Sequence, residues 1–430
     1  MIDIELIRKE SDRIRQGLKN KQADPALVDR FLALDGEWRE GVAKLDLLRH
    51  EQKKLGEARK IEEAKTLKVS IKELHERVLA LEAKRSDALL QIPNLPDPDV
   101  PVGKDASGNK VMRTWGKPPK FDFQPKDHLE LGEKLGIIDV ETAAKVSGSR
   151  FNYLKGDAVL LEFAIVKHVL DILASKKILK KIADKIEKGY SVKPFVPVLP
   201  PAMIKPDVFR RMARLEPGQE EERYHLPKDD LYLIGSAEHT MGAMHMGEII
   251  PEEQLPLRYV GFSTSFRREA GSYGKDVRGI LRVHQFDKLE IESFTAPELS
   301  RKEQDFIVAL QEHLMQSLTL PYRVVMICTG DMGGPDARQI DIETWMPGQN
   351  QYRETHTSDM MTDYQARRLG TKLRRKSGET EFVHMNDATA FAIGRILIAI
   401  LENCQTKEGA VKIPAALQKY VGKKAITSNS

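Results

Sequence analysis

The sequence predicts an α+β protein in which an N-terminal antiparallel two-helix coiled-coil arm precedes an antiparallel β-sheet domain flanked by helices. Residues 26–92 contain no proline and place apolar residues three and four positions apart. Beyond residue 110, alternating strand-like segments follow one another with few helices between them, which favours an antiparallel sheet over a doubly wound parallel one. We therefore expect one domain at 1–100, with the arm at about 27–92, and a second at 101–430.

The predicted arm rests on two heptad seams. Their apolar or small residues alternate spacings of three and four, as in a coiled coil, at Phe31, Leu34, Trp38, Gly41, Leu45, Leu48 and Leu55, and at Leu67, Ile71, Leu74, Val78, Leu81, Ala88 and Ile92. Residues 56–60 lie between the seams and are expected to reverse the chain, and Pro93 ends the second helix. Two helices of about 30 residues, at ~1.5 Å per residue, make a hairpin roughly 45 Å long.

Two functions remain open for this arm from its residues alone. It could be a structural or dimerising coiled coil, or it could contact a nucleic-acid backbone. Residues 27–92 hold 14 Lys and Arg against 13 Asp and Glu, so their net charge does not favour the second function. Phosphate contacts would require a basic stripe on one face of the arm.

The second domain is expected to contain both kinds of element. Strands are predicted at 190–201, 259–266 and 282–294, and helices at 155–174, 296–318, 361–374 and 389–405. The sequence contains neither G-x-x-x-x-G-K-[ST] nor G-x-G-x-x-G after a predicted strand, which argues against the two common nucleotide-binding folds.

Composition narrows the class of protein. Lys and Arg total 68 against 64 Asp and Glu, a formal charge of +4 over 430 residues, which excludes a histone-like polycation. Two cysteines, Cys328 and Cys404, cannot form a disulfide framework or a four-thiolate zinc site. The sequence has no run of 18 apolar residues and no secretory apolar region at its start, so we expect a cytoplasmic protein without a membrane partner.

The most informative stretch is FRREAGSYGKDVRG at 266–279, followed by 280–290. It predicts a strand, a Gly-rich basic loop and a second strand whose alternate residues share one face, namely Arg282, His284, Phe286, Lys288 and Glu290. An arginine fork suits a phosphate, an aromatic face suits a purine, and a carboxylate suits an ammonium or hydroxyl group. A hairpin with a solvated charged face would give the same pattern.

This stretch resembles the second signature motif of the class II aminoacyl-tRNA synthetases, and specifically the seryl-tRNA synthetase pattern FRxEAGSxGxDxRGLxRxHQFxKxE. Other segments resemble the same family in the expected order. MIDIELIRKESDRIRQGLKNK at 1–21 is similar to its N-terminal signature, PFVPVLPPAMIK at 194–205 to the first class II motif, and ATAFAIGR at 388–395 to the third. The resemblance implies a class II synthetase-like catalytic domain after a tRNA-binding arm.

The resemblance also implies roles for individual residues. Arg267, Glu269 and Arg395 would be catalytic, with Arg267 on the α-phosphate and Arg395 facing the γ-phosphate of ATP. The implied ATP-binding set is Arg267, Arg268, Glu269, Phe286, Glu354, Thr355, His356, Thr357 and Arg395. The implied serine-binding set is Ser236, Ala237, Glu238, Arg267, Glu290 and Thr389. Glu354 and Thr357 would hold Mg²⁺.

The chain departs from the family pattern at two places in this set. Asp387-Ala388-Thr389-Ala390 stands where the family has Asn-Gly-Ser-Gly, which adds a methyl group and removes two glycines. Residues 354–360 read ETHTSDM where the family commonly has Glu-Ile-Ser-Ser-Cys-Ser-Asn. Both changes bear on substrate detail more than on ATP binding.

The resemblance implies that the chain activates L-serine with ATP and transfers it to tRNA(Ser), with tRNA(Sec) as a further acceptor, and acts as a homodimer. The physical chemistry agrees, because attack of a carboxylate on a phosphate needs positioning and charge neutralisation. Two rivals are a ligase that loads a small amino acid onto a carrier protein and a catalytically silent paralogue. The full-length arm argues against the first rival, and the joint presence of Arg267, Glu269 and Arg395 argues against the second.

Overall fold

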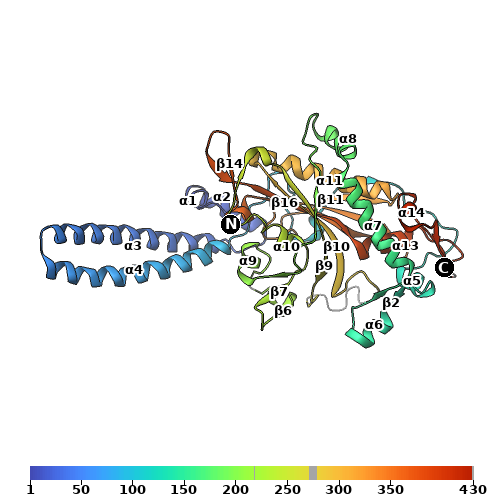
Figure 1. The fold of residues 1–430 in the computed structure, drawn as a ribbon, viewed down its shortest axis with the longest axis horizontal. Helices are drawn as coiled ribbons and strands as arrows, with labels where there is room; N and C mark the ends of the chain where they lie inside the picture. The colour runs from blue at the N-terminus through green and yellow to red at the C-terminus, as the bar shows by residue number, and fades with distance from the viewer. Residues whose placement is uncertain (217, 271–277, 429–430) are drawn as a thin grey trace. The chain divides into compact units, whose positions relative to one another are not determined.

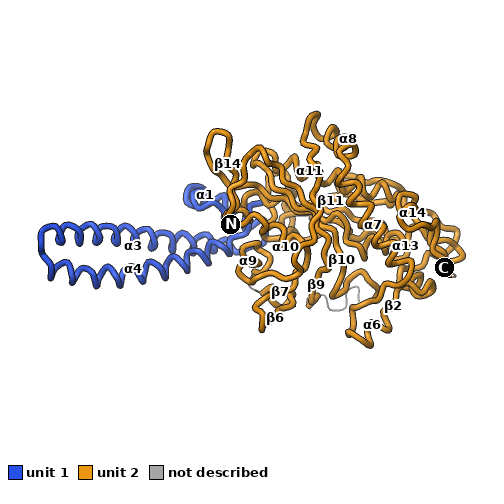
Figure 2. The backbone as a smooth tube through the Cα atoms, in the orientation of Figure 1, with its two compact units in different colours: residues 1–96 blue, residues 97–430 orange. Residues whose placement is uncertain are grey.

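The computed structural model describes residues 1–216, 218–270 and 278–428, so residues 271–277 of the predicted loop lie outside the described residues. The chain divides into two compact units, Met1–Pro96 and Asp97–Ser430, coloured separately in Figure 2. The first unit is helical and the second contains every strand of the described residues (Figure 1). This arrangement confirms the predicted α+β class.

The first unit consists of α1 (Ile4–Lys9), α2 (Ser11–Asn20), α3 (Ala26–Glu57) and α4 (Ile61–Leu90). Helices α3 and α4 lie side by side as the heptad seams predicted (Figure 1). A Cβ atom on Gly41 would lie 2.9 Å from Val78, so the small residue in the first seam permits close packing against the second. Arg59 adopts a φ of +56° and terminates α3 where the reversal was expected.

A buried carboxylate fixes the base of this hairpin. Asp35 on α3 is fully buried and accepts hydrogen bonds from Arg8 on α1, at 2.9 Å, and from Arg85 on α4, at 2.7 Å. Arg85 also stacks over the ring of Trp38, with its guanidinium carbon 4.4 Å from the ring centroid. Arg85 fills the position of the second seam between Leu81 and Ala88. This charged residue is stabilised there by contacts with an acid and an aromatic ring on the facing helix.

The second unit is built on an eight-stranded sheet in the order β1-β11-β12-β13-β16-β10-β9-β4. Every neighbouring pair is antiparallel except β4 and β9, which run parallel. The strands are β1 (Lys110–Trp115), β4 (Val196–Val198), β9 (Leu257–Phe266), β10 (Gln285–Thr295), β11 (Tyr322–Met326), β12 (Arg338–Met346), β13 (Gln351–Thr362) and β16 (His384–Ala392).

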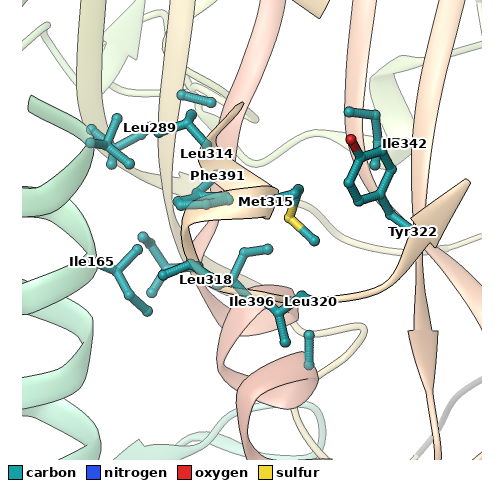
Figure 3. Packing of buried hydrophobic residues seen from close by; sticks show 14 of the residues in the cluster. Ile165, Leu289, Leu314, Met315, Leu318, Leu320, Tyr322, Ile342, Phe391 and Ile396 are labelled. Atoms are coloured by element: carbon teal, nitrogen blue, oxygen red, sulfur yellow. The ribbon is translucent and has the colours of Figure 1, made fainter. Parts of the chain in front are cut away.

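One face of this sheet is covered by α7 (Asp157–Ala174), α11 (Ser300–Ser317) and α13 (Ile393–Asn403). Alternation along β10 sends Leu289 and Ile291 into this covered face, where both are fully buried. Figure 3 shows Leu289, Leu314 of α11 and Ile396 of α13 in this core. The alternate residues Phe286, Lys288 and Glu290 of β10 thereby face the opposite side of the sheet, where the site lies.

Shorter elements complete the second unit. The helices are α5 (His128–Lys134), α6 (Val140–Ser147), α8 (Lys176–Ile186), α9 (Pro206–Arg211), α10 (Glu238–Met241), α12 (Tyr364–Leu369) and α14 (Ala415–Val421). The short strands are β2 (Ile138–Asp139), β3 (Tyr153–Leu154), β5 (Met203–Ile204), β6 (His225–Leu226), β7 (Leu231–Leu233), β8 (Ile249–Pro251), β14 (Lys372–Arg374), β15 (Thr380–Phe382), β17 (Val411–Lys412) and β18 (Ala425–Ile426).

Three sequence predictions in this unit need correction. The predicted helix at 361–374 ends at Leu369, and residues 372–374 form β14 instead. The predicted helix at 389–405 begins only at Ile393, because Thr389 and its neighbours belong to β16. The strand predicted at 190–201 is limited to Val196–Val198. Alanine-rich β16 looks helical in isolation, but pairing with β10 and β13 on either side makes it a central strand.

Candidate active site

The site is a cavity of about 190 Å³ that opens where two central strands separate. Strands β13 and β16 pair as far as Ser358 opposite Ala388, and the next residues of β13 toward its start are no longer paired with β16. The side-chain amide of Gln311 on α11 donates to the freed carbonyls of Thr357 and Thr389, at 2.9 and 2.8 Å. The helix thus stabilises a gap in the sheet that would otherwise leave buried acceptors unpaired.

A β-bulge in β13 determines which of its side chains face this cavity. The register of β12 with β13 shifts between Glu343–Glu354 and Ile342–His356, so Thr355 is an extra residue. This bulge places Glu354 and Thr357, three positions apart, on the same cavity wall. His356 turns to the covered face instead, where its ring centroid lies 5.2 Å from that of Phe391.

Arg395 closes the wall beside Glu354. It lies in the first turn of α13 and its Nη1 donates to the carboxylate of Glu354 at 2.8 Å and to its carbonyl at 2.9 Å. The Glu354 side chain is half exposed, so this ion pair stands at the mouth of the cavity. A bound polyphosphate would have to break this ion pair or bind beside it. Arg395 would then contact the phosphate, and Glu354 would contact a metal ion bound to that phosphate.

The opposite wall carries the arginine, carboxylate and aromatic residues of the second motif. The guanidinium of Arg267 lies 5.3 Å from the ring centroid of Phe286, and its Nε donates to the carbonyl of Gly235 at 3.1 Å. Glu269 adopts a φ of +54° and accepts a 2.6 Å hydrogen bond from Arg282. All four side chains line the cavity, which suits a purine with its phosphates.

The inner end of the cavity is acidic. Glu290 of β10 stands directly opposite Thr389 of β16, and both side chains line the cavity. Burial raises the pKa of Glu290 to about 8, even though Lys288 opposes that shift. The Nζ of Lys288 lies 2.6 Å from Glu290 and donates to the hydroxyl of Ser236 at 3.0 Å. The paired carboxyl and hydroxyl groups can bind a small hydroxylated side chain.

Glu238 provides an anion beside this inner end. It is 6% exposed and lines the cavity. Burial alone would raise its pKa, but the positive charge of Lys288 is among the effects that outweigh burial and hold the pKa below its usual value. A carboxylate that stays ionised in a buried position can bind an ammonium group.

One residue from each of the two departures from the family pattern belongs to a row of three buried acids. Asp359 of β13 is directly opposite Asp387 of β16, which is directly opposite Glu292 of β10. Arg214 donates to Asp387 at 2.8 Å. Burial raises the pKa of Asp387 to about 6 and raises those of Asp359 and Glu292 well above their usual values. Burial therefore favours the protonated forms of Asp359 and Glu292, while Arg214 supplies a counter-charge to Asp387.

The structure brings most of the predicted site residues into one cavity. Those that line it are Glu238, Arg267, Glu269, Phe286, Glu290, Glu354, Thr355, Thr357, Thr389 and Arg395. It does not bring Arg268, His356, Ser236 or Ala237 to the lining. Arg268 stacks over Tyr224, with its guanidinium carbon 5.7 Å from the ring centroid, while Ser236 and Ala237 are fully buried behind Glu238.

The predicted alternating face also needs correction at its start. Strand β10 begins at Gln285, so His284 precedes it and donates from Nδ1 to the carbonyl of Arg267 at 3.0 Å instead of lining the cavity. The site also includes Arg214, Asp387 and Lys288, which were not predicted as site residues. The alternation with Phe286 and Glu290 was a signal for Lys288, whereas no local pattern marks Arg214, whose partner is 173 residues away.

Two further observations concern metal ions and membranes. Over residues 1–216, 218–270 and 278–428, no three His, Cys, Asp or Glu side chains are arranged to hold a metal ion. Within the same ranges, no helix has the length and apolar character needed to cross a bilayer.

Comparison with known proteins agrees with this geometry. Residues 1–96 match the family model for the seryl-tRNA synthetase N-terminal domain, and residues 222–404 match the class II tRNA synthetase core domain (G, H, P, S and T). A serine–tRNA ligase of Acidothermus cellulolyticus is 44% identical, with 98% of each chain covered. The chain belongs to the seryl-tRNA synthetase family.

Solved structures of the same family share the whole fold. The crystal structure of seryl-tRNA synthetase from Pyrococcus horikoshii complexed with ATP has a TM-score of 0.90 and 39% identity, with 99% of each chain covered. The cytoplasmic enzyme from Naegleria fowleri in complex with AMP has a TM-score of 0.88 and 33% identity, again with 99% of each chain covered.

Proposed function

We propose that the chain is a serine–tRNA ligase that activates L-serine with ATP and transfers serine to tRNA(Ser). The observation that carries the proposal is the single cavity that combines Arg267, Phe286 and Arg395 with the opposed pair Glu290 and Thr389. In the first step a serine carboxylate oxygen attacks the α-phosphorus and pyrophosphate leaves. In the second, the terminal ribose hydroxyl of the tRNA attacks the seryl carbonyl and AMP leaves.

The outer part of the cavity is proposed to bind ATP. Phe286 would stack against adenine, Glu269 would face the adenine end, and Arg267 and Arg395 would neutralise the triphosphate along its length. Arg267 is held for this role by Gly235 and by Phe286, so its guanidinium needs little reorganisation when the α-phosphate gains charge. Family relatives solved with ATP and with AMP support this assignment.

Glu354 and Thr357 are proposed to hold Mg²⁺. A carboxylate and a hydroxyl on one wall are hard oxygen donors, and Mg²⁺ is commonly bound by one or two protein oxygens together with substrate phosphates. The bulge at Thr355 fits this proposal because it gives the two side chains a common face. The ion would supply Lewis-acid neutralisation of phosphate charge.

The inner part of the cavity is proposed to bind serine. Glu238 would receive the ammonium group, and Glu290 with Thr389 would receive the hydroxyl group. A substrate without that hydroxyl leaves buried polar groups unpaired, which is the strongest available basis for rejecting alanine. Threonine differs by one methyl group and is the harder competitor.

The first domain, residues 1–100, is proposed to bind tRNA through the hairpin at about 27–92. A long hairpin can lie along the backbone of a folded RNA and recognise its shape. The match of residues 1–96 to the seryl N-terminal family model supports this. Charging of tRNA(Sec) and a cytoplasmic location belong to the same proposal.

Amino-acid-dependent ATP–pyrophosphate exchange tests the proposal. We expect exchange with serine and transfer of serine to tRNA(Ser) by the full chain. Deletion of residues 27–92, with a short Gly/Ser linker in place of the hairpin, should abolish transfer and spare exchange. If no small amino acid supports exchange, every enzymatic assignment is wrong. If the deletion variant still transfers serine to tRNA, the arm is not required for tRNA binding.

A homodimer is also proposed, formed through the end of the sheet. Strand β4 pairs with β9 on one side only, and Val196 and Leu199 are 55% and 81% exposed. An exposed apolar edge strand favours pairing with a second copy. Sedimentation should give a dimer for the wild type and a monomer for Val196→Asp with Leu199→Asp. A wild type that sediments as a monomer at micromolar concentration contradicts this proposal.

A further inference from the structure

A buried histidine outside the cavity contacts the segment that forms one cavity wall. His128 is the first residue of α5, is 5% exposed and does not line the cavity. Its Nε2 lies 3.2 Å from the backbone nitrogen of Ile280, and its Nδ1 lies 3.1 Å from the carboxylate of Glu402 on α13. The ring therefore joins two distant parts of the chain.

The chemistry of these two contacts determines which ring nitrogen donates and which accepts. A backbone N–H can only donate, so Nε2 of His128 must accept the hydrogen bond from Ile280. The hydrogen is then on Nδ1, which donates a hydrogen bond to the carboxylate of Glu402. A carboxylate behind a histidine that selects its tautomer and fixes its orientation is a recognised arrangement in catalytic and metal sites. Here the group that the histidine positions is a backbone amide.

Glu402 is itself fixed from several sides. It is fully buried and accepts from the backbone nitrogen of Gly348 at 2.9 Å, from the side chain of Gln349 at 3.2 Å and from the backbone nitrogen of His128 at 3.2 Å. Gly348 and Gln349 form the turn that leads into β13, the strand of Glu354. Glu402 therefore holds both His128 and the turn before the strand that carries Glu354.

The amide that His128 holds lies at the start of the cavity wall. Ile280, Leu281 and Arg282 all line the cavity, and Arg282 donates to Glu269 at 2.6 Å. A Cβ atom on Gly394, the residue before Arg395, would lie 3.4 Å from the carbonyl of Ile280. A Cβ atom on Gly279 would lie 2.1 Å from Nε2 of His128, and Gly279 has a φ of +81°. The backbone at 279–280 is thus fitted closely between the ring and α13.

We propose that His128, oriented by Glu402, is a positioning residue for ATP. It accepts a hydrogen bond from the backbone amide of Ile280 and thereby positions Arg282 and Glu269 at the adenine end of the cavity. It does not touch the substrate. The serine end of the cavity is built on β10 and β16, which His128 does not contact through any hydrogen bond of the described residues. This inference rests on the proposed function for the identity of the ligand, and it predicts an effect on ATP that serine does not share.

Two substitutions separate the two ring nitrogens. In His128→Gln, the amide oxygen can take the place of Nε2 and accept from Ile280. In His128→Asn, the shorter amide can replace only Nδ1 and donate to Glu402, so Ile280 loses its acceptor. Both variants remove the ring, and a merely structural role would affect them alike. Gly279→Ala is a third variant at a half-buried position, where the added methyl group forces the ring away from Ile280.

The test measures the dissociation constant of Mg·ATP by calorimetry, and the KM for serine in pyrophosphate exchange. We expect His128→Asn and Gly279→Ala to weaken ATP binding about tenfold, the factor that corresponds to the loss of one hydrogen bond of about 1.4 kcal/mol. His128→Gln should stay within about threefold of the wild type, and the KM for serine should change less than about twofold.

Three results would overturn the inference. They are unchanged ATP affinity in Gly279→Ala, equal losses in His128→Asn and His128→Gln, or parallel losses of ATP and serine affinity. If His128→Asn does not fold, Gly279→Ala against His128→Gln makes the same comparison. Calorimetry measures ATP binding without any activation of serine. A wild type that binds ATP but does not activate serine would therefore refute the proposed function and leave this inference intact.

Discussion

Truncation of Glu290 to alanine should remove the discrimination between serine and alanine. Glu290 is 2% exposed and stands opposite Thr389 in the strand pair, so its carboxyl group is the buried group that a serine hydroxyl would satisfy. With the carboxyl group gone, serine and alanine meet nearly the same surroundings. Glu290→Gln keeps a polar group of the same size and should retain most of the discrimination.

The size of the effect follows from the burial of this group. Leaving a buried polar group without its partner costs about 1–3 kcal/mol, which corresponds to roughly 5- to 150-fold. The ratio of kcat/KM for serine to that for alanine should therefore fall about 10- to 100-fold in Glu290→Ala. Pyrophosphate exchange with each amino acid gives the ratio directly, and any loss of folded enzyme cancels in it.

Glu292 offers a matched control on the same strand. It is fully buried, it lies two residues from Glu290 on the same side of β10, and it does not line the cavity. Glu292→Ala makes the same truncation and should leave the serine-to-alanine ratio unchanged. Glu290 does not recognise the serine hydroxyl if Glu290→Ala keeps the wild-type ratio, or if Glu292→Ala lowers the ratio as much.

Three further changes test other parts of the structure. Arg395→Ala removes the cation 2.8 Å from Glu354 and should lower the kcat of pyrophosphate exchange about 100- to 1000-fold at saturating substrates, and a wild-type kcat contradicts its role. Glu303→Gln weakens the fully buried pair with Arg258 and should lower the free energy of unfolding in urea by about 3–5 kcal/mol; a loss below about 1 kcal/mol means that the pair is not needed for stability. Burial lowers the pKa of His168 from 6.5 to about 4, so between pH 6.5 and pH 4 the unfolded chain binds more protons than the folded chain. The free energy of unfolding therefore falls as the pH drops through this interval, by at most about 1.4 kcal/mol per pH unit. His168→Gln should flatten that slope in urea unfolding at several pH values, and an unchanged slope assigns the pH dependence to other groups.

Local patterns in the sequence were sufficient for the arm and for one strand of the site. The heptad seams predicted α3 and α4 because a coiled coil repeats its contacts every few residues, and even the small Gly41 kept its place in the seam. The alternation of Phe286 with Glu290 likewise predicted a shared face, because a strand has a period of two.

Features that depend on distant partners could not be predicted from such patterns. The bulge at Thr355 exists only in the pairing of β13 with β12, and it separates Glu354 and Thr357 from His356. The pairing of Arg214 with Asp387 and that of His128 with Glu402 bring together residues far apart in the chain. Residues 389–392, the end of strand β16, were predicted as helix because local propensity outweighed a sheet context that the sequence does not display.

ATP–pyrophosphate exchange across serine, threonine, alanine, glycine and cysteine measures most directly whether this cavity activates serine. The opposed pair Glu290 and Thr389 predicts exchange with serine well above every other amino acid, with threonine rejected only by the size of the pocket. Exchange with alanine equal to that with serine, or none with any of the five, would contradict the account.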